Sequence, residues 1–343
     1  VLKPALIYFQ QISSDLSFSE TALVLGLISW HLDDKKNAIH YLAQGIGKTI
    51  EGKYIFFPLL DEPTLIEAVV VTAGTDKIIL PEAFASSLLS QYNTSSVFQH
   101  MENLLNSCKK NDATTTINNL RPLYRQLLPK IQIETFGQFK IYYDQKELSS
   151  KDFEGAKPIL LLKAIVLHGS KNIPKEILID ALWPSADAKS GEKNFKINLH
   201  RLRKAIEATY IKQFGYVYIL QKSGLVSLDS QMVTLDADEF MSHSKKAEQF
   251  EFWEEYNSAL NWYDKSAKIY KGDYFSEEPY VEWIARKRDL FRSRYIDLLQ
   301  KKAMLHEELD QAGEAISTWS LMLETDPYYE TAYQNLMILY AAS

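Results

Sequence analysis

The sequence predicts a mainly α-helical protein with a small β component. Along most of the 343 residues, apolar positions recur every three to four residues, which is the period of a helix. Between residues 131 and 228, short stretches instead alternate apolar and polar residues or flank a glycine turn, as strands do. The length favours two or three domains. We therefore expect helical domains on either side of a small mixed domain.

The first 128 residues are predicted to be helical. An antiparallel pair is expected over Thr21–Trp30 and Lys36–Ile50, where small residues stand at offsets typical of a tetratricopeptide repeat. The polar stretch Asn111–Thr116 is expected to be a loop before a short helix that ends at Pro129. The remaining helices are expected at Leu65–Ala73, at Pro81–Tyr92 and near Val97–Cys108. This region is therefore predicted to be a helical-repeat domain.

The period changes at residue 131. Ile131–Phe136 alternates apolar and polar residues, and Phe139–Tyr143 follows it after a glycine, so both stretches are predicted strands. A polar loop is expected over Ser185–Ser190. Glycine, proline and this loop separate three predicted helices, which cover Lys157–His168, Pro174–Trp183 and Lys193–Ile206.

A β-hairpin is predicted after the third helix. Tyr216–Leu220 and Leu225–Leu228 are apolar stretches, and the turn Lys222-Ser223-Gly224 lies between them. Strands, three helices and a terminal hairpin form the order of a winged helix-turn-helix. From Asp236 onward the chain is predicted to be helical again. Ala315, Trp319, Met322 and Pro327 fit the second helix and exit of a tetratricopeptide repeat, and Tyr328–Ala341 would supply the next helix.

The predicted helix Lys193–Ile206 has two opposite faces. At about 100° per residue, its apolar residues fall within an arc of roughly 60°. These apolar residues are Phe195, Leu199, Leu202 and Ile206, and the opposite side gathers Lys193, Lys196, His200, Arg203 and Lys204. One face can dock on a core while the other meets phosphates and base edges. A solvated surface without a partner would show the same pattern.

Eight residues are candidates for contact with DNA. They are Lys193, Asn194, Lys196, His200, Arg201, Arg203, Lys204 and, on the hairpin turn, Lys222. Lysine and arginine suit phosphates and the groove, whereas Asn194 and His200 suit base edges. Arg201 lies to the side of the cationic face, so phosphate binding and packing at the core rim both remain open. Lys222 is either a minor-groove contact or a plain turn lysine.

The charge distribution agrees with this location. The whole chain carries a net charge of −6, but residues 131–230 have 15 Lys and Arg against 11 Asp and Glu, a net charge of +4. Residues 231–343 have 12 against 21, a net charge of −9, and residues 1–130 have 11 against 12. The local field decides where a polyanion binds. The basic middle is therefore the expected DNA-binding region, and the acidic end is either a solvated surface or a partner-binding face.

Other chemistry is not expected. Gly45–Thr49 resembles the end of a phosphate-binding loop, but Leu42 stands where the first glycine is needed and no strand precedes it. Gly45 and Gly47 are instead expected to permit close helix packing. Cys108 is the single cysteine, His306 lacks the second histidine of a helical zinc site, and no nucleophile motif occurs. We expect no enzyme, no cofactor and no metal.

Several strings in the second part of the chain resemble one family. They are Glu176–Pro184, Asn194–Ile206, Leu235–Phe240, Tyr270–Tyr274 with Trp283, and Asp326–Tyr340. Through them, residues 131–343 resemble bacterial transcriptional activators that join an OmpR-type winged helix to a helical bacterial transcriptional activator domain. Residues 1–128 are similar to the helical-repeat tail of MalT-like regulators. One departure is Glu192, where we would expect a basic residue.

The resemblance implies three domains: a helical-repeat region over 1–129, a winged helix-turn-helix over 130–230 and the activator domain over 231–343. It implies a cytoplasmic, sequence-specific DNA-binding regulator that binds double-stranded DNA, recruits RNA polymerase and assembles as a homo-oligomer on DNA. No apolar run is long enough for a membrane span, and the single cysteine fits a reducing compartment. The alternative is a tetratricopeptide-type adaptor that binds protein partners without binding DNA.

Overall fold

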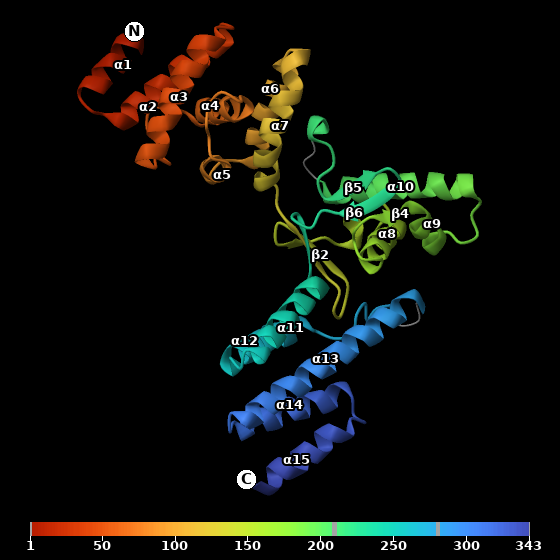
Figure 1. The fold of residues 1–343 in the computed structure, drawn as a ribbon. Helices are drawn as coiled ribbons and strands as arrows, with labels where there is room; N and C mark the ends of the chain where they lie inside the picture. Colours follow the sequence, from red (N-terminus) through yellow and green to blue (C-terminus); the bar gives the residue numbers. More distant parts are fainter. Residues whose placement is uncertain (1, 208–210, 279–281, 343) are drawn as a thin grey trace. The chain divides into compact units, whose positions relative to one another are not determined.

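The computed structural model describes residues 2–207, 211–278 and 282–342, with a mainly helical fold and a small β component (Figure 1). The chain forms two compact units. The N-terminal unit contains Val1–Pro129 and Glu207–Val217, and the C-terminal unit contains Lys130–Ile206 and Tyr218–Ser343. No helix in the described ranges is both long enough and apolar enough to cross a membrane.

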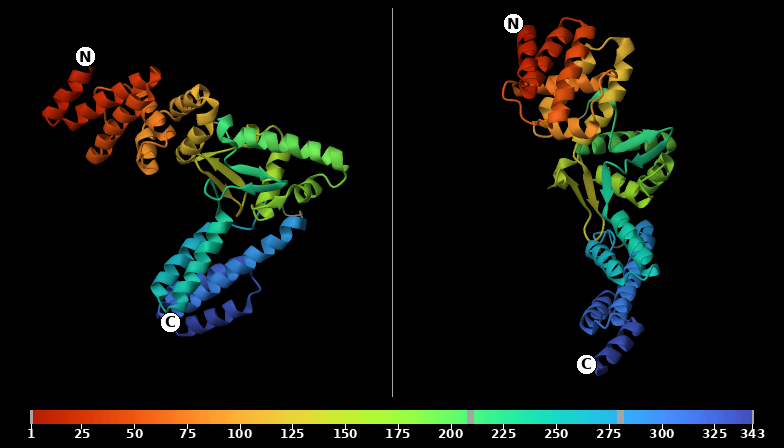
Figure 2. Two further views of the ribbon diagram at one scale, coloured as in Figure 1. Left: turned by 45° about the horizontal axis from the view of Figure 1, so that its top comes forward. Right: turned by 60° about the vertical axis from the view of Figure 1, so that its left-hand side comes forward.

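The N-terminal unit is built mainly from helices, which are drawn from red to gold in Figure 2. Its helices are α1 Leu2–Gln11, α2 Asp15–His31, α3 Lys35–Gly52, α4 Glu62–Gly74, α5 Glu82–Leu89, α6 Thr94–Ser107 and α7 Lys110–Leu127. The predicted pairing of α2 with α3 is confirmed. A Cβ at Gly45 would lie 2.9 Å from the Leu23 side chain, so this glycine permits the close approach. The expectation for Gly47 is wrong, because its Cβ position faces open space.

The expected loop over Asn111–Thr116 is also wrong, because these residues belong to α7. Threonine and asparagine are only weak helix formers, and tertiary packing overrides that preference here. Thr116 is buried, and its methyl group lies 3.2 Å from the Cβ position of Gly74 on α4. Asp112 in the first turn also favours the helix by interacting with its dipole.

A segment from the middle of the chain belongs to the N-terminal unit. Glu207–Val217 contains a short 3₁₀ helix, η2, over Lys212–Phe214. The Phe214 ring stacks on Tyr124 of α7 with 4.6 Å between ring centroids. The Tyr124 hydroxyl also accepts a hydrogen bond from the backbone N–H of Ile211 at 3.4 Å. This segment therefore shares the aromatic core of α7.

The C-terminal unit opens with a four-stranded sheet in the order β3-β2-β1-β7. The strands are β1 Ile131–Glu134, β2 Lys140–Tyr143, β3 Lys146–Glu147 and β7 Val233–Leu235. β1 runs antiparallel to β2, with Ile131 opposite Tyr143, and parallel to β7, with Ile131 opposite Val233. The predicted strands around Ile131 and Tyr143 are confirmed. β7, which was not predicted, brings the chain back beside its first strand.

Three helices and a hairpin lie between β3 and β7 in the chain. The helices are α8 Ala156–Leu167, α9 Lys175–Leu182 and α10 Ala188–Ile206, and the second sheet has the order β4-β6-β5. Its strands are β4 Ile173–Pro174, β5 Ile219–Lys222 and β6 Leu225–Leu228. The turn residues Ser223 and Gly224 have φ angles of 50° and 81°, which suit a two-residue hairpin turn. The predicted helices and hairpin are confirmed, except that α10 begins inside the expected loop.

The rest of the C-terminal unit consists of antiparallel helices. These are α11 Asp236–Phe252, α12 Tyr256–Ile269, α13 Glu282–Glu308, α14 Ala312–Thr325 and α15 Glu330–Ala342. α11 pairs with α12, and α13 pairs with α14. Trp319 of α14 is fully buried and donates a hydrogen bond from its indole N–H to Glu307 of α13 at 2.6 Å. The predicted second helix around Trp319 is confirmed. The side chain of Trp283 lies outside the described residues.

Candidate nucleic-acid interface

The first helix turn of α10 is fixed by two local features. Asp187 accepts hydrogen bonds from the backbone N–H groups of Lys189 at 2.9 Å and Ser190 at 3.0 Å, so it caps the helix. A Cβ at Gly191 would lie 2.7 Å from the Ile179 side chain. Glycine at this position therefore lets α10 cross α9 closely. The cap lengthens the helix beyond the predicted start at Lys193.

The two faces of α10 are as the periodicity predicts, with one exception. The four apolar residues Phe195, Leu199, Leu202 and Ile206 are each at most 3% exposed. They dock the helix on the core of the region formed by α8, α9, α10 and the β4-β6-β5 sheet, which is called the winged region below. The opposite face is exposed and carries Lys189, Lys193, Lys196, Ile197, His200, Arg201 and Lys204. Asn194 lies half-buried at the edge of this face.

The exception is Arg203, which is only 9% exposed. Its Nε and Nη2 donate hydrogen bonds to the carbonyl oxygen of Ile219 at 3.2 and 2.7 Å. The prediction that Arg203 lies on the exposed cationic face is therefore wrong. The reason is tertiary: Ile219 begins the hairpin strand β5, whose position beside α10 the helical period cannot reveal. Arg203 connects the helix to the hairpin.

Glu192 does not present an unbalanced negative charge. Its carboxylate lies 2.7 Å from the Lys175 Nζ and 3.1 Å from the Lys196 Nζ. Hydrogen bonds from these two lysines lower the pKa of Glu192, and the same contact raises the pKa of Lys175. Glu192 therefore stays ionised and holds Lys196 at one edge of the exposed face.

Glu154, in the segment before α8, balances the other end of the cationic face. Its carboxylate lies 2.7 Å from the Lys204 Nζ and 3.5 Å from the Arg201 Nε. The hydrogen bond from Lys204 lowers the pKa of Glu154. A phosphate that binds Lys204 or Arg201 must therefore displace this carboxylate. The sequence period gave no signal for this contact, because Glu154 is 50 residues away from Lys204.

The hairpin turn carries the predicted residue Lys222, which is exposed. Because side chains alternate along a strand, Leu220 shares its face of the hairpin, and Leu225 stands directly opposite Lys222. Both leucines are 37% exposed. The outward face of the hairpin is therefore partly apolar, with Lys222 next to two exposed leucines.

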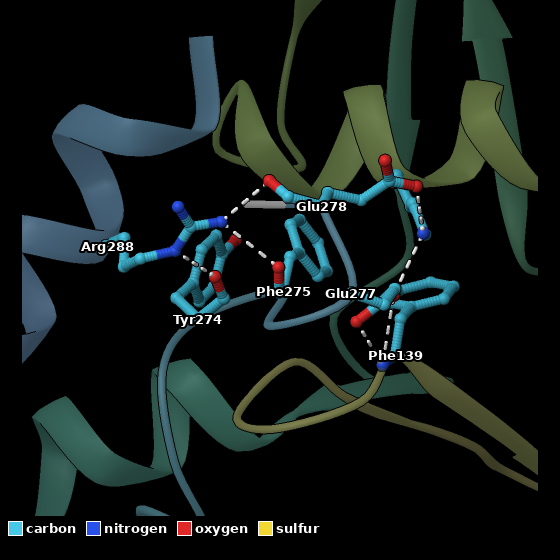
Figure 3. Close-up of polar contacts among 7 residues, drawn as sticks. Phe139, Tyr274, Phe275, Glu277, Glu278 and Arg288 are labelled. Carbon is cyan, nitrogen blue, oxygen red and sulfur yellow. Dashed lines mark hydrogen bonds and ion pairs between the residues drawn. The ribbon is translucent and has the colours of Figure 1, made fainter. Parts of the chain in front are cut away.

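An ion cluster around the buried Lys163 joins α8 to Glu277 and Glu278, which are about one-third exposed and lie after α12 in the chain (Figure 3). Lys163 of α8 is nearly buried, and its Nζ lies 2.9 Å from both Glu277 and Glu278. Arg288 of α13 donates hydrogen bonds to the backbone carbonyls of Tyr274, Phe275 and Glu278. The segment between α12 and α13 is thus held on both sides, by α8 and by α13.

A buried carboxylate, that of Asp236, joins the start of α11 to the end of β1. Asp236, the first residue of α11, accepts hydrogen bonds from the Thr135 hydroxyl at 2.6 Å and from the Thr135 and Phe136 backbone N–H groups at 2.7 and 3.0 Å. The Phe136 ring packs against Phe240 and Phe291, with ring centroids 5.3 and 5.2 Å apart. The end of β1 is therefore part of the core formed by α11 and α13.

No group of three or more His, Cys, Asp or Glu side chains in the described part of the chain is placed to hold a metal ion. The segment Gly45–Thr49 lies inside helix α3, so it is not the loop that a phosphate-binding motif requires. The exposed cationic face of α10 is therefore the feature of the C-terminal unit to which a ligand chemistry can be assigned most directly.

Comparisons with known proteins agree with a regulatory architecture. Residues 235–343 match the family model described as the bacterial transcriptional activator domain. Among solved structures, the fold is similar to Mycobacterium tuberculosis EmbR in complex with a low affinity phosphopeptide, with 14% identity and a TM-score of 0.53. The match covers 62% of this chain and 55% of that one, so the chain spans about half the length of its solved relative. No curated protein matches this chain. The solved structure shows the shared fold alone, and the family match over residues 235–343 is what supports a bacterial transcriptional activator.

Proposed function

We propose that this protein is a sequence-specific DNA-binding transcriptional regulator that activates transcription. The observation that carries the proposal is the exposed face of α10. On this face the side chains of lysine and arginine surround Ile197 and His200, while the opposite face of the helix is buried. This is the layout of a helix that reads the major groove. Lys193, Lys196 and Lys204 are the proposed phosphate contacts, and Asn194 and His200 are the proposed base contacts.

The dimensions of α10 divide these roles along the helix. Its 19 residues span about 28 Å, whereas the major groove is about 12 Å wide. Residues near the middle therefore meet base edges, and residues near the ends meet phosphates. Arg201 contacts the backbone once Glu154 has been displaced. Lys222 on the hairpin turn would follow the neighbouring minor groove or its phosphates, as the wing of an OmpR-type domain does.

The helices α11–α15 are proposed to contact RNA polymerase and to hold protomers together on DNA. Support comes from the family match over 235–343 and from the net charge of −9 over residues 231–343. An acidic surface is repelled by DNA, so it leaves the cationic face of α10 as the part that binds the duplex. The division into regions 1–129, 130–230 and 231–343 describes these proposed roles.

The N-terminal unit is proposed to pass on a signal, as the helical-repeat tail of a MalT-like regulator would. The segment Glu207–Val217 supports this role, because in the chain it connects α10 directly to β5 and the hairpin. It is anchored to α7 through Phe214 and Tyr124. A rearrangement of α7 would therefore act on the connection between the reading helix and its wing.

A gel-shift titration of the full chain against a genomic promoter library, at several salt concentrations, tests the proposal. Phosphate contacts make affinity fall steeply with salt, by a logarithmic slope of about 0.9 for each phosphate neutralised. We expect a saturable shift with a slope of several units. The alternative, an adaptor that binds only proteins, predicts no saturable shift at any salt concentration.

A further inference from the structure

One aliphatic side chain stands inside the cationic face of α10. Ile197 is 39% exposed, although the residues that surround it on that face are charged or polar. Lys193 and Arg201 lie one helical turn away on either side of it, and His200 lies three residues further along. A beta-branched aliphatic group at this position does not contribute to phosphate binding.

The packing of α10 does not explain Ile197. The helix is already docked by Phe195, Leu199, Leu202 and Ile206, each at most 3% exposed. Ile197 lies on the opposite side, so its partial exposure is a property of the surface and not of the core. An isoleucine fixed at χ1 also loses little entropy when a contact orders it. The side chain is therefore suited to a rigid apolar contact with a ligand.

We propose that Ile197 is a specificity-determining residue that reads the C5-methyl group of thymine in the major groove. The inference rests on the proposed DNA-binding function. Ile197 is the tenth of the 19 residues of α10, so it lies at the middle of the helix, where base edges are nearest. Among the four base pairs, only those containing thymine present a methyl group in the major groove.

This assignment explains how a largely cationic face discriminates between sequences. Lysine contacts to phosphates position the helix but carry no sequence information. Asn194 is half-buried, so only part of its side chain is open to a base edge. Ile197 adds an apolar determinant beside the polar base contacts proposed for Asn194 and His200. The selected sites should contain a thymine at a fixed position in each half-site.

The test uses the full chain and compares a selected duplex with versions of it that each carry one uracil in place of thymine. A binding site is first selected from a random duplex library, and it is then synthesised with uracil in place of thymine at one position at a time. Uracil keeps every hydrogen-bonding group and removes only the methyl group. For the wild-type protein, the dissociation constant should rise about fourfold at one position per half-site, the equivalent of one buried methyl group.

Variants assign that effect to one side chain. Ile197→Ala should bind the thymine and uracil duplexes equally well, and Ile197→Val should retain most of the discrimination because it keeps the branched methyl groups. Ile177→Ala is the matched control, since Ile177 on α9 is 42% exposed and lies outside the cationic face. It should leave the fourfold effect unchanged. Circular dichroism of each variant reports that the fold is retained.

Three results would overturn the inference. Sensitivity to uracil that persists in Ile197→Ala would assign the methyl contact to another residue. Saturable, salt-dependent binding with no sensitivity at any thymine would refute the methyl contact but leave the DNA-binding function standing. Failure of the wild-type chain to select any duplex would refute both the function and the inference.

Discussion

Arg203 connects α10 to the first residue of the hairpin. Its Nε and Nη2 donate hydrogen bonds to the carbonyl oxygen of Ile219, and the side chain is almost completely buried. A hydrogen bond from a charged donor to a carbonyl oxygen is stronger than one from a neutral donor. Arg203 therefore contributes to the stability of the winged region, and its buried side chain does not lie on the exposed face that is proposed to contact DNA.

We predict that Arg203→Ala lowers the free energy of unfolding by about 1–3 kcal/mol, because it leaves the Ile219 carbonyl without these donors. Arg203→Lys should lower the free energy of unfolding by less, since lysine keeps one charged donor. Urea unfolding followed by circular dichroism measures both. Arg201→Ala, an exposed change two residues away, is the control and should shift stability by less than about 0.5 kcal/mol. Equal stability of Arg203→Ala and Arg201→Ala would contradict this role.

In the proposed DNA interface, Glu154 competes with phosphates for two cations. It pairs with Lys204 at 2.7 Å and with Arg201 at 3.5 Å, and its lowered pKa keeps it ionised at neutral pH. We predict that Glu154→Gln tightens DNA binding by roughly three- to tenfold at low salt, because the two cations become available to phosphates.

Fluorescence anisotropy with a labelled duplex checks this prediction. Glu147→Gln is the matched control, because Glu147 of β3 is exposed and pairs at 3.8 Å with Lys140 of β2 and not with a residue of α10. It removes the same charge from the same unit. If both variants tighten binding equally, the effect comes from net charge and the specific competition at Glu154 is refuted.

At the scale of single elements, the segment Glu207–Val217 is anchored by aromatic stacking. Phe214 is buried against Tyr124 of α7, and Tyr124 in turn contacts Phe98 of α6 with 4.9 Å between ring centroids. Truncation of a buried phenylalanine costs about 3–5 kcal/mol. The anchoring of the segment should therefore depend strongly on this one ring.

We predict that Phe214→Ala raises amide hydrogen exchange over Ile211–Val217 by at least about 100-fold, because local opening then costs less free energy. Hydrogen exchange followed by mass spectrometry resolves this peptide from its neighbours. Phe56→Ala serves as the control, because Phe56 belongs to the same unit and is 74% exposed. Unchanged protection in Phe214→Ala would show that the stacking does not hold the segment.

The sequence predicts the elements of the winged region well, because the helical and strand periods are strong there. The buried residues Phe195, Leu199, Leu202 and Ile206 follow from the 100° spacing alone. The position of Arg203 does not follow, since it depends on a hairpin strand that lies beside α10 only in the fold. The predicted loop over Asn111–Thr116 fails for a related reason: burial of Thr116 beneath α4 outweighs weak local helix propensity.

At the scale of the C-terminal unit, the buried Lys163 joins α8 to Glu277 and Glu278, which lie after α12 in the chain. Lys163 is 7% exposed at its side chain, whereas Glu277 and Glu278 are 31% and 28% exposed. The lysine also lies over the Phe139 and Phe275 rings, 5.3 and 5.8 Å from their centroids. No sequence pattern indicates this cluster, because Lys163 is more than 100 residues away from both glutamates in the chain.

We predict that Lys163→Met lowers the free energy of unfolding by about 2–3 kcal/mol. Methionine preserves the packing between the two rings, but the charge that balances the glutamates is lost, and breaking a buried pair is costly. Lys301→Met is the matched control: it removes an exposed pair with Glu248 and should cost less than about 1 kcal/mol. Thermal unfolding of the full chain measures both. Equal costs would refute a structural role for the buried cluster.

At the scale of the whole molecule, the proposed function depends on the exposed face of α10 as the surface that binds DNA. The most direct test is the salt dependence of binding for two double variants. Lys193→Ala/Lys196→Ala removes two cations from that face, whereas Lys245→Ala/Lys268→Ala removes two exposed cations from α11 and α12. We predict that the first lowers the logarithmic salt slope by about 1.8 and that the second leaves it unchanged. Equal slopes for the wild type and both variants would contradict the assignment of this face.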